Sequence, residues 1–147
     1  PQGNSMKAQL KQLELTTFII DDGVYYAAPL EGYELYWAST CGFIISTRNL
    51  DPKVLQGKET HNGYLRVCIN TTPIEKVKDL RVHRLVAATF YDYEPIDYNG
   101  KQRLEVNHIN GIKTYNQATN LEWCSSDENV AHFNSVTRVL KQLSKEL

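Results

Sequence analysis

The sequence contains little cysteine, with only Cys41, Cys68 and Cys124 in 147 residues. These residues are odd in number, far apart and never arranged as Cys-x-x-Cys, so neither a disulfide framework nor a zinc finger is indicated. Reduced, partly buried thiols in a cytoplasmic protein are the simplest interpretation.

Long apolar runs and an excess of charge of one sign are also missing. The longest apolar stretches, such as FII at 18–20, have the length of strands, so we expect a soluble protein that does not enter a membrane. The formal net charge of −1 gives no overall attraction to nucleic acid. Residues 45–85 are locally basic, with eight basic and four acidic side chains. On charge alone, a solvated face of mixed charge explains them.

The overall composition is that of a globular protein, with 41% hydrophobic and 22% charged residues. A chain of 147 residues has room for one domain with a real core, or for a compact catalytic unit and a small flanking element. Residues 1–5 lack the charged start and apolar stretch of a signal peptide, so we interpret them as a processing or expression remnant.

Turn signals between apolar runs predict a first half rich in β-structure. An Asp-Gly pair in FIIDDGVYY (18–26) and an Asn-Gly pair in ETHNGYLRVCIN (59–70) each predict a hairpin. Two short strands around a glycine turn are predicted in EGYELYWASTCGFIISTRN (31–49). Before them, AQLKQLEL (8–15) has helical spacing of its apolar residues and predicts a helix.

Helix and strand signals follow each other in the second half. LRVHRLVAATFY (80–91) predicts a helix, DYEPIDYNGKQRL (92–104) a loop, and LEVNHI (104–109) and NLEWCS (120–125) two short strands. Ser125 followed by Glu128 fits a capping box that opens a C-terminal helix. The helix is expected to be amphipathic and to pack on the domain or on a partner through Phe133, Val136, Leu140, Leu143 and Leu147.

The stretch VNHINGIKTYNQATNLEWCSSDEN (106–129) gathers several asparagines around one histidine. Neighbours on a strand point to opposite faces, so Asn107 and His108 can serve one site only at a strand end or a bulge. Asn129 lies about one turn into the predicted helix and can reach back toward that strand end. Neutral imidazole is a serviceable general base, and amide oxygens suit either loop turns or a hard cation. This chemistry suggests phosphodiester hydrolysis, and asparagines that only lock turns are the alternative.

The same residues resemble the HNH nuclease domain of phage homing endonucleases, a ββα-metal nuclease. The matching segments are VHRLVAATF (82–90) and VNHINGIKTYNQATNLEWCSSDENVAHF (106–133). The resemblance implies that Asn107 and Asn129 bind one divalent metal ion, Mg²⁺ or Mn²⁺, and that His108 activates water. Asn120 matches the middle asparagine of the motif, which pins the loop through backbone hydrogen bonds. His132 is a further candidate for phosphate or metal contact, although it can equally be a polar residue at the helix edge.

The resemblance extends upstream, where EGYELYWASTCGFIIS (31–46) and NGYLRVCI (62–69) resemble the NUMOD4-like DNA-binding module that commonly precedes this nuclease domain. It implies an α+β fold in two parts. A small antiparallel sheet (6–78) would bind DNA, and a ββα-metal nuclease motif with a C-terminal helix (79–147) would cut it.

One residue departs from the pattern of the family. Many members have aspartate where this chain has Asn107, and the missing negative charge weakens cation binding before DNA arrives. The resemblance therefore implies a metal site completed by phosphate oxygens of the substrate. It implies a metal-dependent endonuclease, acting in the host cytoplasm if a phage encodes it, and the alternative is an inactive DNA-binding protein on the same scaffold.

The expected partner is double-stranded DNA, and no membrane partner is expected. Phosphate contacts are predicted for basic residues in turns, strand faces and the site loop, namely Arg48, Lys58, Arg66, Arg84 and Lys113. A monomer would nick one strand, whereas a homodimer through the C-terminal helix could cut both. His83 is expected to pack beside its helix, and Trp123 is expected in the core.

Overall fold

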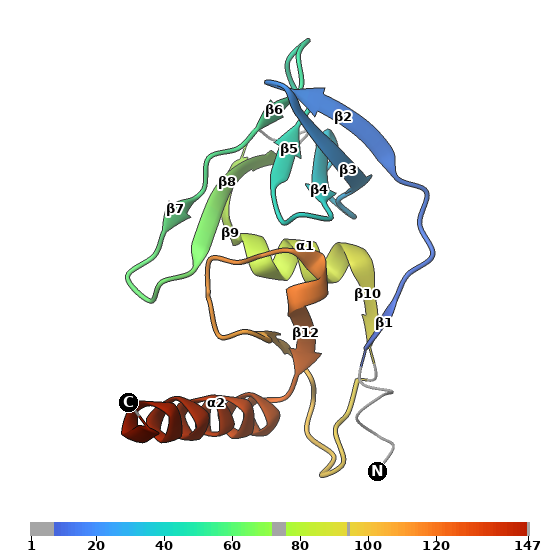
Figure 1. Cartoon of the computed structure of the whole chain (residues 1–147). Helices are drawn as coiled ribbons and strands as arrows, with labels where there is room; N and C mark the ends of the chain where they lie inside the picture. Colours follow the sequence, from blue (N-terminus) through green and yellow to red (C-terminus); the bar gives the residue numbers. More distant parts are fainter. Residues whose placement is uncertain (1–7, 72–75, 94, 147) are drawn as a thin grey trace.

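The computed structural model of the chain describes residues 8–71, 76–93 and 95–146, so the interpretation of residues 1–5 lies outside the described residues. Within this part of the chain, antiparallel sheets and helices are combined as predicted. Four small sheets surround a central helix, and a second helix runs along the lower end of the molecule (Figure 1).

The upper part is a five-stranded antiparallel sheet in the order β2-β3-β4-β5-β6. β2 (Thr16–Ile20) and β3 (Gly23–Pro29) form the first predicted hairpin. Its turn lies at Asp21 and Asp22, one residue before the predicted Asp-Gly pair, and Gly23 is the first residue of β3. Both turn residues have positive φ, 48° and 67°, as a two-residue type I′ turn requires. The other strands, which include the predicted pair around a glycine turn, are β4 (Tyr36–Ser39), β5 (Ile44–Ser46) and β6 (Lys53–Val54).

A three-stranded sheet lies beside the first and contains the second predicted hairpin. Its strands are β7 (Lys58–Glu59), β8 (Leu65–Thr71) and β9 (Lys76–Arg81). The hairpin tip, residues 60–64, is closed by two backbone hydrogen bonds, from Thr60 N to Tyr64 O (2.7 Å) and from Gly63 N to Thr60 O (2.9 Å). This tip reaches toward the lower half of the molecule.

The helix predicted over residues 8–15 is wrong. β1 (Ala8–Leu10) is instead a strand paired antiparallel with β10 (Tyr91–Tyr93), which also places a strand at the start of the predicted 92–104 loop. The three leucines of the segment are exposed, so a helix here would bury no apolar face. Pairing with β10 satisfies backbone groups that a short isolated helix would leave frayed.

The central helix α1 (Val82–Phe90) lies between the upper sheets and the lower strands and contacts β4, β8, β9, β11 and β12. Its apolar residues Val82, Leu85, Val86 and Phe90 are all buried. The helix therefore connects the two halves of the core.

Two strands and a helix follow in the predicted order. β11 (Glu105–His108) pairs antiparallel with β12 (Leu121–Cys124), and the long loop between them ends in a short 3₁₀ turn, Ala118–Asn120. Helix α2 (Ser126–Glu146) begins at the predicted capping box. The hydroxyl of Ser125 accepts from the backbone N–H of Glu128 (3.2 Å), whose carboxylate accepts from the backbone N–H of Ser125 (2.9 Å). Trp123 is buried, as expected.

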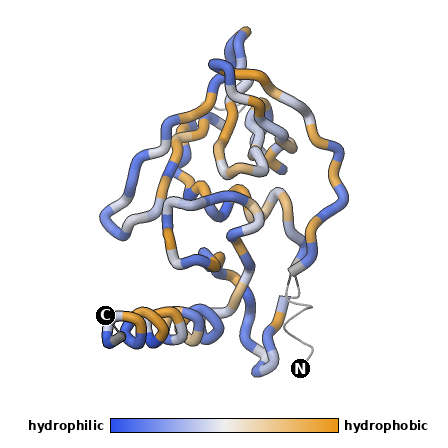
Figure 2. The backbone as a smooth tube through the Cα atoms, viewed as in Figure 1, coloured by the Kyte–Doolittle hydropathy of each residue, from blue (hydrophilic) through white to orange (hydrophobic). Residues whose placement is uncertain are grey.

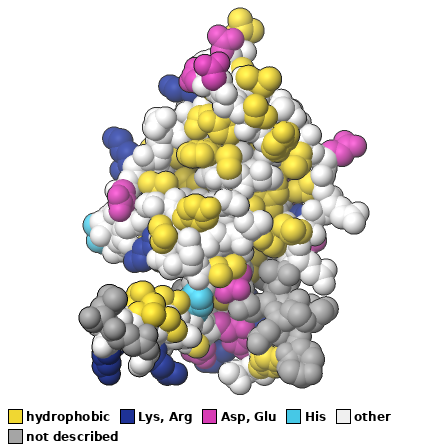
Figure 3. All heavy atoms as spheres, viewed as in Figure 1, with side chains coloured by type: hydrophobic (Ala, Val, Ile, Leu, Met, Phe, Trp, Pro, Cys, Tyr) yellow, Lys and Arg dark blue, Asp and Glu magenta, His cyan; other side chains and the backbone are white. Residues whose placement is uncertain are grey.

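Helix α2 keeps an apolar face in contact with solvent. Its orange residues lie on one side and its blue residues on the other in Figure 2. Phe133, Leu140 and Leu143 are 68%, 60% and 53% exposed, and Leu147 lies outside the described residues. Hydrophobic side chains are also exposed over the upper part of the molecule in Figure 3, and Ile19 of β2 and Tyr26 of β3 are among the exposed apolar residues. Neither helix of the described chain combines the length and hydropathy needed to cross a membrane.

The predicted boundary after residue 78 falls within β9. One hydrophobic cluster contains Ile44 and Ile69 from before this point and Val86 and Leu121 from after it. The described residues therefore share a core across the boundary.

Candidate active site

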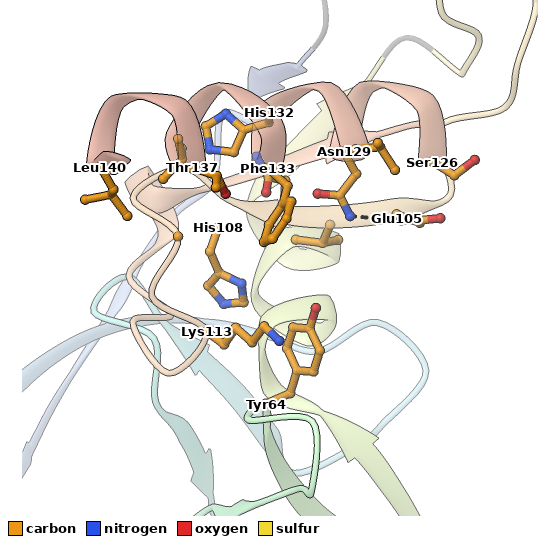
Figure 4. Close-up of a pocket in the computed structure, with 15 residues that line it drawn as sticks. Tyr64, Glu105, His108, Lys113, Ser126, Asn129, His132, Phe133, Thr137 and Leu140 are labelled. Carbon is orange, nitrogen blue, oxygen red and sulfur yellow. Dashed lines mark hydrogen bonds between the residues drawn. The ribbon is translucent and has the colours of Figure 1, made fainter. Parts of the chain in front are cut away.

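A cleft of about 560 Å³ lies between the first turns of α2, the end of β11 and the β7–β8 hairpin tip. Asn129 of α2 lies on one wall, Tyr64 and Lys113 lie on the other, and the imidazole of His108 lies between them (Figure 4). Asn107 also lines this cleft. The fold thus brings the predicted base and both predicted metal ligands to one cavity.

His108 is the last residue of β11, which is the strand end that the sequence pattern required. Its Nε2 lies 2.7 Å from Oδ1 of Asn116. Because an amide oxygen can only accept, Nε2 carries the hydrogen and Nδ1 holds the free lone pair. The side chain lines the cleft although it is only 4% exposed. The imidazole is therefore held in a tautomer that can take a proton at Nδ1.

The surroundings of His108 favour its neutral form. Burial lowers its pKa, the hydrogen bond to Asn116 opposes this shift, and the charge of Lys113 lowers the pKa further. The result is a pKa below the ordinary value of histidine. A base is useful only when deprotonated, so this environment suits proton abstraction at neutral pH.

A second histidine lies directly behind His108. The rings of His83 and His108 have centroids 5.1 Å apart, and the ring of Tyr64 stacks on His83 at 4.8 Å and 17° and lies 6.0 Å from His108. Burial, followed by the nearby His108, lowers the pKa of His83 to about 3, so its ring is neutral. Its Nδ1 is buried and has no hydrogen-bond partner within the described chain. His83 packs, as expected, but it packs against the site.

Each of the two predicted ligand amides is oriented by a carboxylate. Asn107 donates from Nδ2 to Glu122, its partner across the β11–β12 pair (3.1 Å), and Asn129 donates from Nδ2 to Glu105 (2.9 Å, Figure 4). A carboxylate only accepts, so the amide nitrogens must face the glutamates. Neither Oδ1 accepts a hydrogen bond from a described residue.

Asn120 forms the loop contacts that were expected of it. Its Nδ2 donates to Oδ1 of Asn110 (2.9 Å) and to the carbonyl of Tyr115 (2.8 Å), while its Oδ1 accepts from the backbone N–H of Asn110 (3.0 Å). One side chain thus joins the beginning and the end of the loop.

The β4–β5 turn closes on the same loop from above. Gly42 has a φ of +93°, and a Cβ atom there would lie 2.3 Å from the carbonyl carbon of Asn116. Thr40 accepts a backbone hydrogen bond from Ala118 (2.9 Å). The upper sheet therefore fixes the backbone of the residue that holds His108.

A buried ion pair fixes the start of α2, where Asn129 lies. The guanidinium of Arg103 donates to both carboxylate oxygens of Glu128, at 2.9 and 3.1 Å, and Arg103 is buried. The hydroxyl of the capping Ser125 donates to Asp97. Such bidentate, charge-assisted bonds hold a defined geometry.

One of the five predicted DNA-contact residues lines the cleft. Lys113 donates from Nζ to the carbonyl of Asn62 in the hairpin tip (2.9 Å) and lies 5.0 Å from the ring centre of Tyr64. His132 also lines the cleft, and its Nε2 donates to the carbonyl of Ile109 (2.8 Å), which ties α2 to the site loop.

The other predicted DNA contacts lie outside the cleft. Lys58 and Arg66 face each other across the β7–β8 pair and line a shallow depression of the upper sheets, where Arg66 pairs with Asp79 (3.0 Å). Arg48 lines a neighbouring depression. Arg84 donates to the carbonyl of Leu104 (2.9 Å) and lies over Trp123.

Three site residues were missed from the sequence. Glu122 is recognisable only once the strand register places it opposite Asn107. Glu105 shares a strand face with Asn107 at a spacing of two, a signal that was available. Nothing in the sequence distinguishes Asn116 from the other asparagines of the loop.

The side chains that line the cleft include the amides of Asn107 and Asn129, the carboxylate of Glu105 and the imidazoles of His108 and His132. The described residues contain no group of three or more His, Cys, Asp or Glu side chains placed to hold a metal ion. Hard cations such as Mg²⁺ prefer oxygen ligands and retain several waters, so two amide oxygens with further oxygens from a substrate fit such an ion.

The fold and the site together define a protein of mixed sheet and helix that is similar to an HNH homing endonuclease. A solved structure that describes DNA binding and cleavage by the HNH homing endonuclease I-HmuI is similar to this chain. The two chains are 30% identical, and their structures align with a TM-score of 0.62. The match covers 81% of this chain and 66% of that chain.

Two proteins of Acanthamoeba polyphaga mimivirus, both named as uncharacterized HNH endonucleases, are also similar. One is 33% identical over 109 residues and the other 38% identical over 104 residues, covering 74% and 71% of this chain. The matched region spans only about a quarter of each viral relative, 25% and 28%. No family model matches the chain. The names of these relatives and the structural match support the assignment of this chain to the HNH family of endonucleases.

Proposed function

We propose that this chain is a metal-dependent HNH endonuclease of the homing type, which hydrolyses phosphodiester bonds in double-stranded DNA. The observation that carries the proposal is an imidazole held through Nε2 by Asn116, in a cleft that Asn107 and Asn129 also line. The similarity to I-HmuI and the viral origin of the two relatives support it.

His108 is proposed as the general base. It accepts a proton at Nδ1 from a water molecule whose oxygen forms a new bond to the scissile phosphorus. The bond from phosphorus to the 3′ oxygen breaks, and solvent protonates the departing oxygen, which leaves 5′ phosphate and 3′ hydroxyl ends. Asn116 holds the imidazole of His108 and stabilises the imidazolium that forms when Nδ1 takes the proton. Its amide oxygen accepts from Nε2–H in both protonation states.

Asn107 and Asn129 are proposed as the protein ligands of one Mg²⁺ or Mn²⁺ ion. Their hydrogen bonds to Glu122 and Glu105 turn the amide nitrogens away and leave both Oδ1 atoms for coordination. When bound, the cation supplies positive charge that stabilises the phosphate and the leaving oxygen in the transition state. Because both ligands are neutral, phosphate oxygens of the DNA are expected to complete the site.

The basic side chains outside the cleft are proposed to position the duplex. Lys58 and Arg66 lie on one sheet face and Lys113 lies in the cleft, so a duplex that spans both places could contact all three. Such contacts bind phosphates without reading sequence, and affinity is expected to fall steeply as salt rises.

The proposal is tested by titrating Mn²⁺ against the conversion of supercoiled plasmid to open circles. Wild-type protein is expected to nick in a saturable, metal-dependent way, and excess EDTA is expected to stop it. Asn129→Ala should need a higher Mn²⁺ concentration for half-maximal rate, whereas the matched control Asn134→Ala, an exposed amide on the same helix, should not.

Two other results of the plasmid experiment would favour the alternatives to a nuclease. Plasmid that is shifted on a gel but never cut, with or without EDTA, would favour the inactive DNA-binding protein. Plasmid that is neither shifted nor cut would mean that the asparagines only hold a loop.

A further inference from the structure

Three rings from distant parts of the chain meet beside the cleft. Tyr64 comes from the β7–β8 hairpin tip, His83 from the first turn of α1 and His108 from the end of β11. The centroid distances are 4.8 Å between Tyr64 and His83, 5.1 Å between His83 and His108, and 6.0 Å between Tyr64 and His108. Each ring therefore contacts the other two.

The hydrogen bond to Asn116 fixes only one atom of the His108 ring. An imidazole held at Nε2 can still tilt about that contact, and tilting moves Nδ1, the atom proposed to take the proton. Displacements of about 1 Å in a reacting group can cost as much as 100-fold in rate. A second contact on the ring face is needed to set its plane, and His83 and Tyr64 provide it.

The choice of histidine at position 83 is costly for stability. Its ring is buried, yet Nδ1 has no hydrogen-bond partner in the described residues. A buried polar atom without a partner destabilises a fold, and an apolar side chain would avoid this loss. The flat ring of His83 stacks against Tyr64 at 17°. Its contribution therefore comes from the contacts of the ring faces and not from a hydrogen bond at Nδ1.

The hairpin tip is itself held against the site. Lys113, which follows His108 in the site loop, donates to the carbonyl of Asn62 and lies over the ring of Tyr64. Tyr64 is half-buried and lines the cleft beside His108. The tip of a hairpin in the upstream half is therefore part of the site wall.

We propose that Tyr64 and His83 are positioning residues that set the plane of the His108 ring. Through Tyr64, the upstream β7–β8 hairpin then helps to orient the general base. This inference rests on the proposed nuclease function. It assigns to the first half of the chain a role in the chemistry that is separate from DNA binding.

The test compares Tyr64→Phe with Tyr64→Leu in plasmid nicking, measured as the rate at saturating protein and the protein concentration for half-maximal rate. Phenylalanine keeps the stacked ring and removes only the hydroxyl, and leucine removes the ring. Tyr64→Phe is expected to keep most of the wild-type rate, because the ring that contacts His108 remains. Tyr64→Leu is expected to lower the saturated rate by about 10-fold while the half-maximal concentration stays within about twofold. His83→Phe should likewise keep more rate than His83→Leu.

Two kinetic results would overturn the inference. If Tyr64→Phe is as slow as Tyr64→Leu, the hydroxyl rather than the ring acts. If only the half-maximal concentration changes, Tyr64 serves DNA binding. Thermal unfolding of each variant identifies any loss that comes from the fold.

A second readout does not depend on activity. In ¹³C relaxation spectra, the ring of His108 is expected to be rigid in wild type and in Tyr64→Phe. Tyr64→Leu should show larger motion of the ring, because one of its face contacts is lost while Nε2 stays held by Asn116. Equal rigidity in all three proteins would refute the positioning role. Wild-type protein that fails to cut DNA would refute the proposed function, and these spectra would still decide the positioning role.

Discussion

At the scale of single residues, the main feature of this site is that two glutamate carboxylates orient the two proposed ligand amides. Glu122 and Glu105 each accept one amide hydrogen, from Asn107 and Asn129, and so determine where the amide oxygens point. A neutral amide contributes less cation affinity than a carboxylate, but it can lie beside a glutamate without repulsion. An uncharged amide at position 107 is therefore compatible with the carboxylate of Glu122 beside it.

We predict that Asn107→Asp makes the stability of the protein dependent on metal. The new carboxylate would lie beside Glu122, where the amide now donates at 3.1 Å, and two close carboxylates repel each other unless a cation or a proton intervenes. Thermal unfolding without divalent metal should occur at a lower temperature than in wild type, and Mn²⁺ should restore it. The double variant Asn107→Asp, Glu122→Gln should remove the defect. Equal unfolding temperatures with and without Mn²⁺ would speak against this arrangement.

Nicking activity is expected to rise with pH as His108 loses its proton and then to level off. Burial lowers the pKa of His108, and the charge of Lys113 lowers it further. Removing that charge in Lys113→Met raises the pKa, so a larger fraction of the base is protonated at a given pH and the midpoint moves to higher pH. The control Lys145→Met, near the end of α2, should leave the midpoint in place. A pH profile without any change in Lys113→Met would contradict this view of the site.

At the scale of elements, two turns of the upper sheets support the site loop. The β4–β5 turn contacts Asn116 through Gly42, and the β7–β8 tip contacts Lys113 through Asn62. Because both contacts end on the loop that follows His108, we expect a change in either turn to alter the position of the base.

Gly42→Ala is predicted to reduce both stability and nicking. A methyl group at this position would meet the backbone of Asn116 at 2.3 Å, and the backbone at φ +93° is strained for any residue with a Cβ atom. Gly32→Ala is the matched control, because Gly32 has a similar φ of +82° but nothing lies within 4 Å of its added methyl group. Gly42→Ala should lose more activity and more stability than Gly32→Ala. Equal losses in the two variants would show that the contact with Asn116 is unimportant.

Local signals predicted most of these elements. The two hairpins, the position of His108 at a strand end and the capping box at Ser125 follow from turn chemistry and spacing, which act over a few residues. The spacing of the segment 8–15 predicts a helix, yet its first residues, Ala8–Leu10, pair with β10 some 80 residues away. Asn116 and His83 gain their roles only from three-dimensional contacts, which a local pattern does not contain.

At the scale of the whole molecule, the two predicted parts share one core. Helix α1 contacts strands from both, and the cluster around it includes Ile69 from the upstream part and Leu121 from the downstream part. The site is similarly shared, since Tyr64 lies on its wall.

A fragment of residues 79–147 is therefore predicted not to fold on its own. Cutting after residue 78 divides β9 and exposes the face of α1 that β4 and β8 cover. Circular dichroism of the fragment should show a broad thermal change, whereas the full chain should unfold cooperatively. A fragment with a cooperative transition and metal-dependent nicking would instead support two independent domains.

The most direct test of the account is the rate at which His108→Ala nicks supercoiled plasmid at saturating Mn²⁺, compared with wild type. Loss of a general base typically lowers a rate by about 10² to 10⁴-fold, and we predict a loss in this range or greater while DNA binding and thermal unfolding stay close to wild type. A folded His108→Ala protein that binds DNA and nicks it at the wild-type rate would contradict the central claim.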